Sequence, residues 1–430
     1  MATVRPFRGV MYNQKKVGNL DDVVTPPYDV ISPADQQAYY DHNPYNTVRL
    51  ILPMEDGSVN PTAKYESSSS FLNQWLSEGI LVRDDEPALY AIRQQYEING
   101  EVKQRLGFTC LVKLEDYSQG TVLPHENILA KPMDDRLNML RFTKSNYDSV
   151  FGLYSDEETQ HILETAIHSA PDVSATDKDG VLCELWRISD CVVVQVIVKA
   201  LAKKSILIAD GHHRYAAALA YRDEMRETAG SINEEAPYEY VMMTLVSLDD
   251  PGLVVLPTHR MIRNLESFDA PAFITQLSEH FEISEVAPDA LTQSVETLFS
   301  KGHAFGLCIG QKAYTVMLKP DAKPEELITT PSSAALKNLD VTLLHSLILE
   351  RYLGIGSKQM SAQSNLTYTR SVDEAIRLVD EGTYQMAFLM NPTRVSEVRA
   401  IAASGEKMPQ KSTFFYPKLL AGMIIRLIAD

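Results

Sequence analysis

Hydrophobic and polar positions follow the period of a strand in some parts of the chain and the period of a helix in others. Residues 89–96 and 102–112 alternate as strands do, and the Asn99-Gly100 pair between them is typical of a tight turn, so they predict a β-hairpin. An apolar run at 205–209 predicts a short buried strand, followed by a helix over 212–228. The same periods predict helices near 156–169 and 191–203, and strands near 240–248 and 253–256.

Serine, asparagine and proline mark the starts of two helices nearer the N-terminus. Ser32-Pro33 supplies a capping side chain and a proline for the first turn, and Asn60-Pro61 repeats this signal. Residues 25–30 read as an extended loop because two adjacent prolines stiffen it. The polar stretch over 123–136 also predicts a loop.

The second half of the chain alternates between helical and strand patterns. Helices are predicted near 270–281, 289–300, 340–352 and 371–380, and strands near 304–309, 312–318 and 384–390. The polar segment 231–237 is the best boundary, which gives domains over 1–230 and 231–430. The elements predict an α/β (α+β) fold class with mixed sheets, in which the C-terminal domain is itself α/β.

The junction after the predicted strand at 205–209 carries several reactive side chains within five residues. Gly211 permits a tight turn after Asp210, and His212, His213 and Arg214 form the first turn of the next helix. Unpaired amides at a helix start favour an anion, and an arginine fork suits phosphate or carboxylate. Asp210 is a candidate to bind Mg²⁺ or to accept a proton. In the structural alternative, Asp210 caps the helix and pairs with Arg214.

A second group of reactive residues lies in the predicted loop over 123–136. His125 and Glu126 are candidates for a general base or for metal ligands, and Lys131 and Arg136 are candidates to neutralise phosphate. The alternative for this segment is a solvated charged loop.

Two further segments carry weaker signals. His259 and Arg260 follow Leu256-Pro257-Thr258, and either a ligand-binding or a structural role fits them. Lys411 belongs to a Lys-Ser-Thr run that lacks the preceding glycines of a P-loop, so it predicts proximity to a ligand without a Walker site. A zinc site on the adjacent His212-His213 pair would need ligands from elsewhere, such as His259 or His125, because their rings diverge on a helix.

Composition narrows the classes of partner. The net charge of −17 disfavours general nucleic-acid binding and docking on anionic membranes. No apolar run has the length of a membrane span, and the first ten residues lack the apolar core of a signal peptide. The scattered cysteines favour reduced thiols and a cytoplasmic location. These cysteines are Cys110, Cys183, Cys191 and Cys308.

Five ordered motifs resemble one prokaryotic family, the domain of unknown function 1015, whose members are often labelled ParB-like chromosome-partitioning regulators. The resemblance runs from Arg5-Pro6-Phe7 to Gly422. The motifs are Pro26-Pro27-Tyr28-Asp29-Val30-Ile31, Pro124-His125-Glu126, Ala209-Asp210-Gly211-His212-His213-Arg214-Tyr215, Leu256-Pro257-Thr258-His259-Arg260 and Met408-Pro409-Gln410-Lys411-Ser412-Thr413-Phe414.

The Asp-Gly-His-His-Arg box is similar to one in the ParB/sulfiredoxin-like superfamily, which includes partition proteins, sulfiredoxins and free serine kinases. The resemblance implies a nucleotide-binding core in which Gly211, His212, His213 and Arg214 cradle phosphates. The chain departs from partition proteins in its acidity and in lacking a convincing helix-turn-helix pattern, and His212 stands where sulfiredoxin chemistry needs a cysteine.

The first functional hypothesis is a phosphotransferase that uses ATP or ADP with Mg²⁺ on a small hydroxylated metabolite, similar to free serine kinases. Here Arg214 neutralises charge with Lys131 or Arg136, Asp210 holds Mg²⁺, and Glu126 or His125 is the base. His259, Arg260 and Lys411 are further ligand-binding candidates. The alternatives are a nucleotide-binding regulatory module without metabolite turnover, or a ParB-like DNA-associated regulator. The sequence leaves homo-oligomerisation open.

Overall fold

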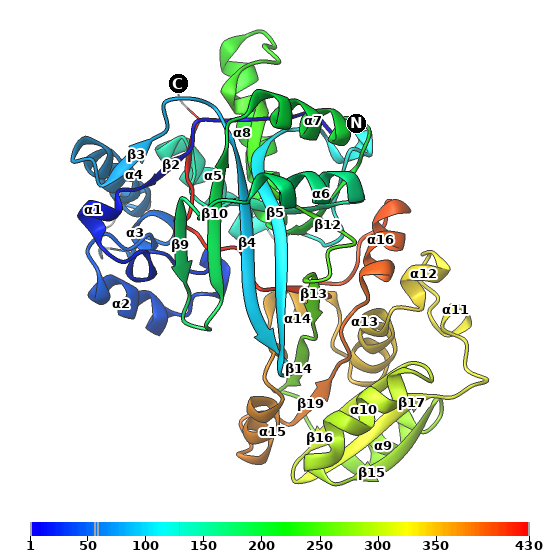
Figure 1. Ribbon diagram of the computed structural model, residues 1–430. Helices are drawn as coiled ribbons and strands as arrows, with labels where there is room; N and C mark the ends of the chain where they lie inside the picture. The colour runs from blue at the N-terminus through cyan, green and yellow to red at the C-terminus, as the bar shows by residue number, and fades with distance from the viewer. Residues whose placement is uncertain (1, 56, 58–59, 129, 429–430) are drawn as a thin grey trace. The chain divides into compact units, whose positions relative to one another are not determined.

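The predicted hairpin supplies the longest strands of the protein. In the computed structural model, which describes residues 2–55, 57, 60–128 and 130–428, β4 (Leu89–Ile98) pairs with β5 (Glu101–Lys113) around Asn99-Gly100, as predicted (Figure 1). The chain forms two compact units. Unit 1 contains residues 1–124, 128–253 and 417–430, and unit 2 contains residues 125–127 and 254–416.

Unit 1 is built on a nine-stranded mixed sheet. Its order is β6-β11-β8-β12-β5-β4-β10-β9, with β1 paired to β5. The pairs β11–β6 and β12–β8 are parallel and the others are antiparallel, so the predicted α/β class with mixed sheets is confirmed. The remaining strands are β1 (Val4–Arg5), β6 (Val122–Leu123), β8 (Val150–Tyr154), β9 (Val173–Thr176), β10 (Leu182–Ile188), β11 (Ile206–Asp210) and β12 (Tyr240–Ser247).

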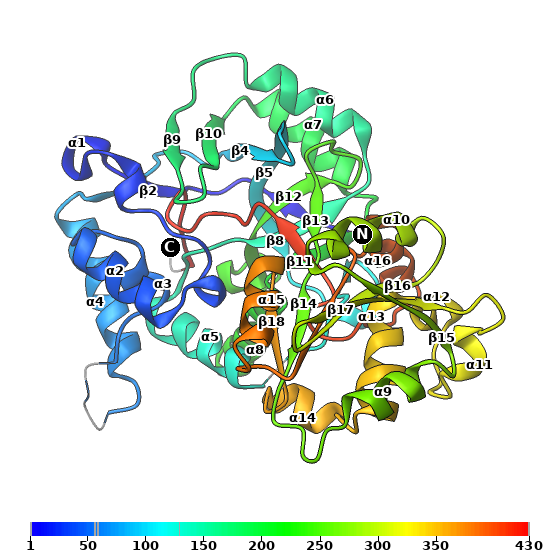
Figure 2. The ribbon, with the colours of Figure 1, turned by 90° about the horizontal axis from the view of Figure 1, so that it is seen from below.

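Helices of unit 1 cover this sheet with their apolar sides. Leu163, Ile197 and Tyr215 are almost fully buried in one core with Phe108 of β5 and Tyr154 of β8. They belong to α6 (Glu157–Ala166), α7 (Cys191–Leu201) and α8 (His212–Ala229). The α6 and α7 helices lie side by side, as α5 (Ala130–Thr143) and α8 do (Figure 2).

The predicted helix starts near the N-terminus are also present. Ser32 caps α2 (Pro33–His42) in a reciprocal capping box with Asp35. The second signal precedes α4 (Ala63–Ser77).

The prediction of a loop over 123–136 is wrong in its second part, because α5 begins at Ala130; Leu129 lies outside the described residues. Polar residues and Pro132 in the first turn make the start of this helix difficult to predict, because its buried apolar residues begin only at Leu137. Proline is tolerated there because first-turn amides need no partner inside the helix.

Unit 2 contains a six-stranded antiparallel sheet in the order β15-β17-β16-β19-β14-β18. Met261 and Ala387 on this sheet share a core with α10 (Leu291–Phe299) and α15 (Val372–Asp380). Other helices of this unit are α9 (Ala270–Leu277) and the π-helical segment η6 (Leu344–Tyr352). The strands are β14 (His259–Ile262), β15 (Phe281–Val286), β16 (Ala304–Ile309), β17 (Lys312–Leu318), β18 (Leu366–Thr369) and β19 (Met386–Leu389).

A two-stranded ribbon of β13 (Val254–Leu256) and β20 (Phe414–Tyr416) completes unit 2. Residues 125–127 join this unit because Glu126 forms a parallel bridge with Met408.

The compact units separate after residue 253, whereas the sequence places the domain boundary after residue 230. The segment between these points contains β12, whose residues pair with β5 and β8 of unit 1. The C-terminal residues 417–430 also return to unit 1, where β21 (Arg426–Leu427) pairs with β7 (Ser145–Asn146). No helix in the described part of the chain has both the length and the hydropathy needed to cross a membrane.

Candidate functional site

The Asp210–Arg214 turn joins the end of β11 to the start of α8. Gly211 is the N-cap residue and has a φ of 88°, a left-handed conformation that side chains disfavour. A Cβ at this position would lie 2.8 Å from Nε of Arg214. Glycine is therefore required for two reasons: the conformation of the backbone, and the space that the Arg214 side chain occupies beside it.

Arg214 uses this space to bind two carboxylates. Its Nη2 donates to Oδ2 of Asp210 at 2.5 Å, and its Nη1 donates to Oδ2 of Asp148 at 2.8 Å and to the carbonyl of Ser149 at 2.7 Å. Lys418 donates to the other oxygen of Asp210. These contacts form a chain of four charges in the order Asp148, Arg214, Asp210, Lys418, which we call the charge chain.

The charge chain is mostly removed from water. The side chains of Arg214, Asp148, Lys418 and Asp210 are 9%, 10%, 12% and 15% exposed, respectively. Burial alone would raise the pKa of Asp210, but the positive charges of Lys418 and Arg214 outweigh it and hold that pKa well below its ordinary value. Burial would likewise lower the pKa of Arg214, and Asp148 and Asp210 raise it instead. Asp210 is therefore an ionised carboxylate at neutral pH and a weak proton acceptor.

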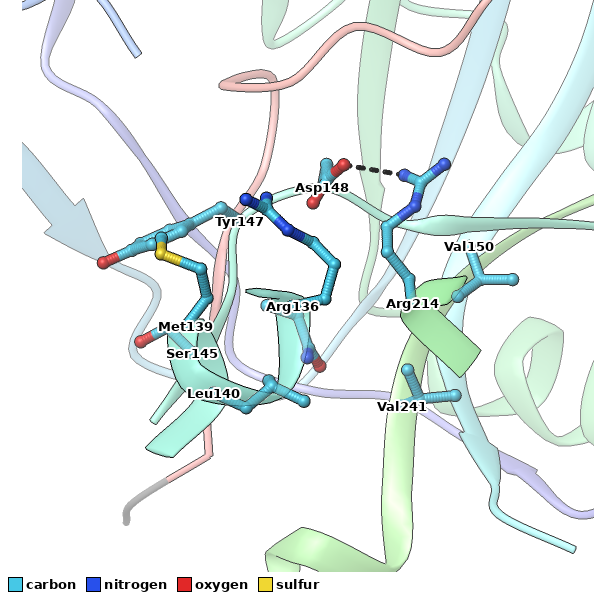
Figure 3. A pocket seen from close by; sticks show the side chains of 10 residues that line it. Arg136, Met139, Leu140, Ser145, Tyr147, Asp148, Val150, Arg214 and Val241 are labelled. Carbon is cyan, nitrogen blue, oxygen red and sulfur yellow. Dashed lines mark hydrogen bonds and ion pairs between the residues drawn. The ribbon is translucent and has the colours of Figure 1, made fainter. Parts of the chain in front are cut away.

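Figure 3 shows Asp148 between the side chains of Arg136 and Arg214, at the edge of a small cavity. Met139, Tyr147 and other residues line the cavity, whose volume of about 30 Å³ has room for about one water molecule. A nucleotide therefore does not fit in this cavity, and the candidate surface for a larger ligand is the start of α8.

Arg136 was predicted to neutralise phosphate, and its guanidinium already has several contacts. It binds Oδ2 of Asp135 and donates to the carbonyl of Ile51 at 2.9 Å, and its guanidinium carbon lies 3.9 Å from the centre of the Tyr28 ring. Burial raises the pKa of Tyr28, while the charges of Arg136 and Arg214 act to lower it. Lys131 lies in the first turn of α5 and is exposed.

Within the first turn of α8, His212 is 6% exposed and His213 is half-buried. The charge of His212 also acts on Asp210. The helix begins without a side-chain cap and without an acidic residue in its first turn. Its N-terminal amides and two imidazoles thus lie next to the charge chain.

The other predicted residues belong to unit 2. Oε1 of Glu126 accepts a hydrogen bond from the backbone amide of Lys411 at 2.7 Å, so these two residues are in contact. His125 is fully buried, with its Nε2 2.9 Å from Oγ1 of Thr413.

Arg260 and His259 are also buried in unit 2. Arg260 donates to the carbonyls of Thr258 and Lys411. Nδ1 of His259 accepts from the Met390 amide at 3.1 Å, and burial followed by the charge of Arg260 lowers the pKa of His259 to about 4. The structure thus divides the predicted residues between two groups, one in each unit.

Sequence reasoning missed Asp148 and Lys418, which have no motif of their own. Tyr28 did lie within a recognised motif, and its Pro-Pro-Tyr-Asp pattern was the signal that could have assigned it to the site. Within the described residues, no group of three or more His, Cys, Asp or Glu side chains is arranged to hold a metal ion.

The family model described as protein of unknown function (DUF1015) matches residues 4–342. The chain belongs to this family. The matched DUF1015 region contains the Asp210–Arg214 turn and Asp148, whereas Lys411 and Lys418 lie beyond it. No curated protein matches the sequence significantly.

Solved structures similar to this DUF1015 chain include a free serine kinase in complex with AMP, at 14% identity and a TM-score of 0.35, covering 71% of this chain and 86% of the kinase. A free serine kinase mutant with ADP has 13% identity and a TM-score of 0.36, covering 71% and 87%. A conserved hypothetical protein from Pyrococcus furiosus has 16% identity and a TM-score of 0.34, covering 72% and 92%. These TM-scores do not establish a shared fold, and the wider kinship with ParB-like proteins stays a prediction.

Proposed function

We propose that the chain is a nucleotide-dependent phosphotransferase that binds the phosphates of ATP or ADP at the start of α8 and phosphorylates a small hydroxylated metabolite. The observation that supports this proposal is the buried charge chain beside the uncapped start of an 18-residue helix. The metabolite and the nucleotide are the partners that this function implies.

The charge chain is poorly explained by stability alone. Removing charges from water is expensive, and a buried ion pair is often no more stabilising than well-packed apolar side chains. Strongly perturbed carboxylates cluster at functional sites for this reason. Asp210, which is shared by two buried cations at the junction of a strand and a helix, fits that pattern.

The contacts refine the roles of the individual residues. Arg214 is a positioning residue in this proposal, because its Nη atoms are engaged by Asp210, Asp148 and Ser149. Lys418, the N-terminal amides of α8 and the two histidines are the groups assigned to phosphate. An anion is favoured there because the helix start carries partial positive charge.

The residues at the turn suit Mg²⁺ in part. Mg²⁺ enters with phosphates and uses only one or two protein carboxylates, and Asp210 has the ionised carboxylate that it needs. Since both oxygens of Asp210 are paired, the ion has to displace Lys418 or Arg214 from one of them. When bound, Mg²⁺ neutralises negative charge on the transferred phosphoryl group.

The proposal is tested by replacing Lys418 and a matched lysine of the same unit. Lys418→Met should weaken binding of ADP and ATP by roughly tenfold to a hundredfold, the effect of losing one charged hydrogen bond of about 1.5–3 kcal/mol. The control is Lys178→Met, because Lys178 also pairs with an aspartate, Asp35, but is 50% exposed; it should leave nucleotide affinity unchanged. Calorimetric titration with and without Mg²⁺ measures both variants.

Turnover is measured as ADP release from ATP, or AMP release from ADP, in the presence of a panel of hydroxylated metabolites. If no nucleotide binds, or if the two lysine variants behave alike, the proposed site is refuted. Nucleotide binding without phosphate transfer to any metabolite would instead favour a regulatory module.

A further inference from the structure

Arg260 in unit 2 is a buried cation without a counter-charge in close contact. The residue is 1% exposed, and in the described ranges no carboxylate lies within ion-pair distance of its guanidinium. Its Nη atoms donate to backbone carbonyls of Thr258 and Lys411, which are neutral. Burial has the largest effect on the pKa of Arg260 and lowers it to about 10. The charge of Glu126 has a smaller effect and acts to raise that pKa.

The sheet register places Tyr368 next to this arginine. Arg260 on β14 is directly opposite Tyr368 on β18, so their side chains lie on the same face of the sheet. The guanidinium carbon is 5.5 Å from the centre of the Tyr368 ring. His259 precedes Arg260 on the same strand, and the alternation of side chains directs it to the other face.

His345 is a further buried side chain of unit 2. It lies on η6 and is 7% exposed. Burial, followed by the charge of Arg260, lowers the pKa of His345 well below its ordinary value, so the imidazole is neutral.

Each of these three side chains has a buried polar atom without a hydrogen-bond partner. The atoms are Nε of Arg260, the hydroxyl of Tyr368 and Nε2 of His345. Buried polar groups are nearly always satisfied in folded proteins, so the unpartnered atoms of Arg260 and of Tyr368 opposite it need an explanation. The weak attraction between the cation and the Tyr368 ring does not supply one, because it uses neither Nε nor the hydroxyl.

The chemistry of the Arg260 and Tyr368 atoms defines what complements them. The Nε–H of arginine can only donate, and the tyrosine hydroxyl can donate. A positive charge with several donors matches a group that has a negative charge and several acceptors. We propose that unit 2 binds a small oxyanion, a carboxylate or a phosphate group, through Arg260 and Tyr368.

This oxyanion site goes beyond the proposed phosphotransferase, because none of its residues belongs to the charge chain or to the start of α8. The two sites are therefore separable by mutation. Lys418→Met weakens the phosphate site of unit 1 and leaves the oxyanion site unchanged.

The test is calorimetric titration of the full chain with sodium phosphate or sodium acetate at constant ionic strength, with sodium chloride as the reference salt. It is done in the parent and in Lys418→Met. Tyr368→Phe removes one donor and should weaken binding at the oxyanion site about tenfold or more, and Arg260→Met should abolish it. Arg263→Met is the matched control, because it removes the same charge from an exposed position of the same segment and should have no effect.

The expected result is one saturable site. Its affinity is unchanged by Lys418→Met and by Arg263→Met, and it is reduced by Tyr368→Phe. The anion that binds with the higher affinity, phosphate or acetate, identifies the chemical class of the ligand. If Arg260→Met fails to fold, Tyr368→Phe decides, because it deletes only a hydroxyl without a partner. The proposal is overturned if neither anion binds, if chloride competes equally, or if Tyr368→Phe binds as the parent does.

Discussion

Replacing Gly211 by alanine tests whether the Asp210–Arg214 turn has the tight geometry described above. At a φ of 88°, an alanine pays a conformational cost of about 1–2 kcal/mol. The new Cβ would also lie 2.8 Å from Nε and 2.9 Å from Nη2 of Arg214, so the guanidinium has to move. Loss of one of its charged hydrogen bonds adds about 1.5–3 kcal/mol.

The matched control is Gly230→Ala at the other end of α8. Gly230 has a φ of 67°, and a Cβ added there would meet no atom within 4 Å. The two variants thus share the conformational cost and differ in the displacement of Arg214. We expect a loss of about 2.5–5 kcal/mol for Gly211→Ala and about 1–2 kcal/mol for Gly230→Ala.

Thermal unfolding followed by circular dichroism measures the difference. At roughly 2–4 °C per kcal/mol, Gly211→Ala should lower Tm by about 5–20 °C and Gly230→Ala by about 2–8 °C. Equal losses of Tm in the two variants would show that Arg214 moves aside without cost. The inference that its contacts hold Asp210 in place would then be refuted.

Two further predictions concern Asp210 and His259. Asp210→Asn should abolish phosphoryl transfer while metal-free nucleotide binding persists, and it should lower Tm because Lys418 and Arg214 lose their shared counter-charge; an activity equal to that of the parent would exclude Asp210 from the chemistry. His259 has a pKa of about 4 in the folded chain against 6.5 as its ordinary value, so the unfolded chain takes up this proton first as pH falls. Stability should therefore decrease as pH falls from about 6.5 to 4, by about 3 kcal/mol from this residue. His259→Asn, whose amide oxygen can still accept from the Met390 amide, should flatten that part of a urea-unfolding profile against pH, and an unchanged profile would show that His259 does not cause the loss.

The local part of the site could be predicted from the sequence, because it depends on neighbouring residues. An apolar run, a glycine and an alanine-rich helix define the strand, turn and helix around Asp210 within a short window. The partners of this turn could not be predicted in the same way. Asp148 is 66 residues from Arg214, and Lys418 is 208 residues from Asp210, so only the folded chain brings them together.

The α/β class followed from local periods, whereas the grouping of the elements did not. The strand over 240–248 was predicted from its apolar run, yet its place in unit 1 depends on pairing with β5 and β8. Arg260 gave only a weak signal, because its neighbours in the sequence do not indicate that its side chain is buried or that no carboxylate pairs with it. Tyr368 carried no signal at all, since only the sheet register brings it to Arg260.

The return of residues 417–430 to unit 1 constrains how the protein is made. Lys418 and β21 follow all of unit 2 in the order of synthesis, so translation of about 160 residues, from 254 to 416, has to intervene. At roughly 5–20 residues per second, this takes about 10–30 s. During that interval the nascent unit 1 holds Asp210 and Arg214 but lacks the lysine that neutralises Asp210, so the charge chain assembles only after most of the polypeptide has emerged.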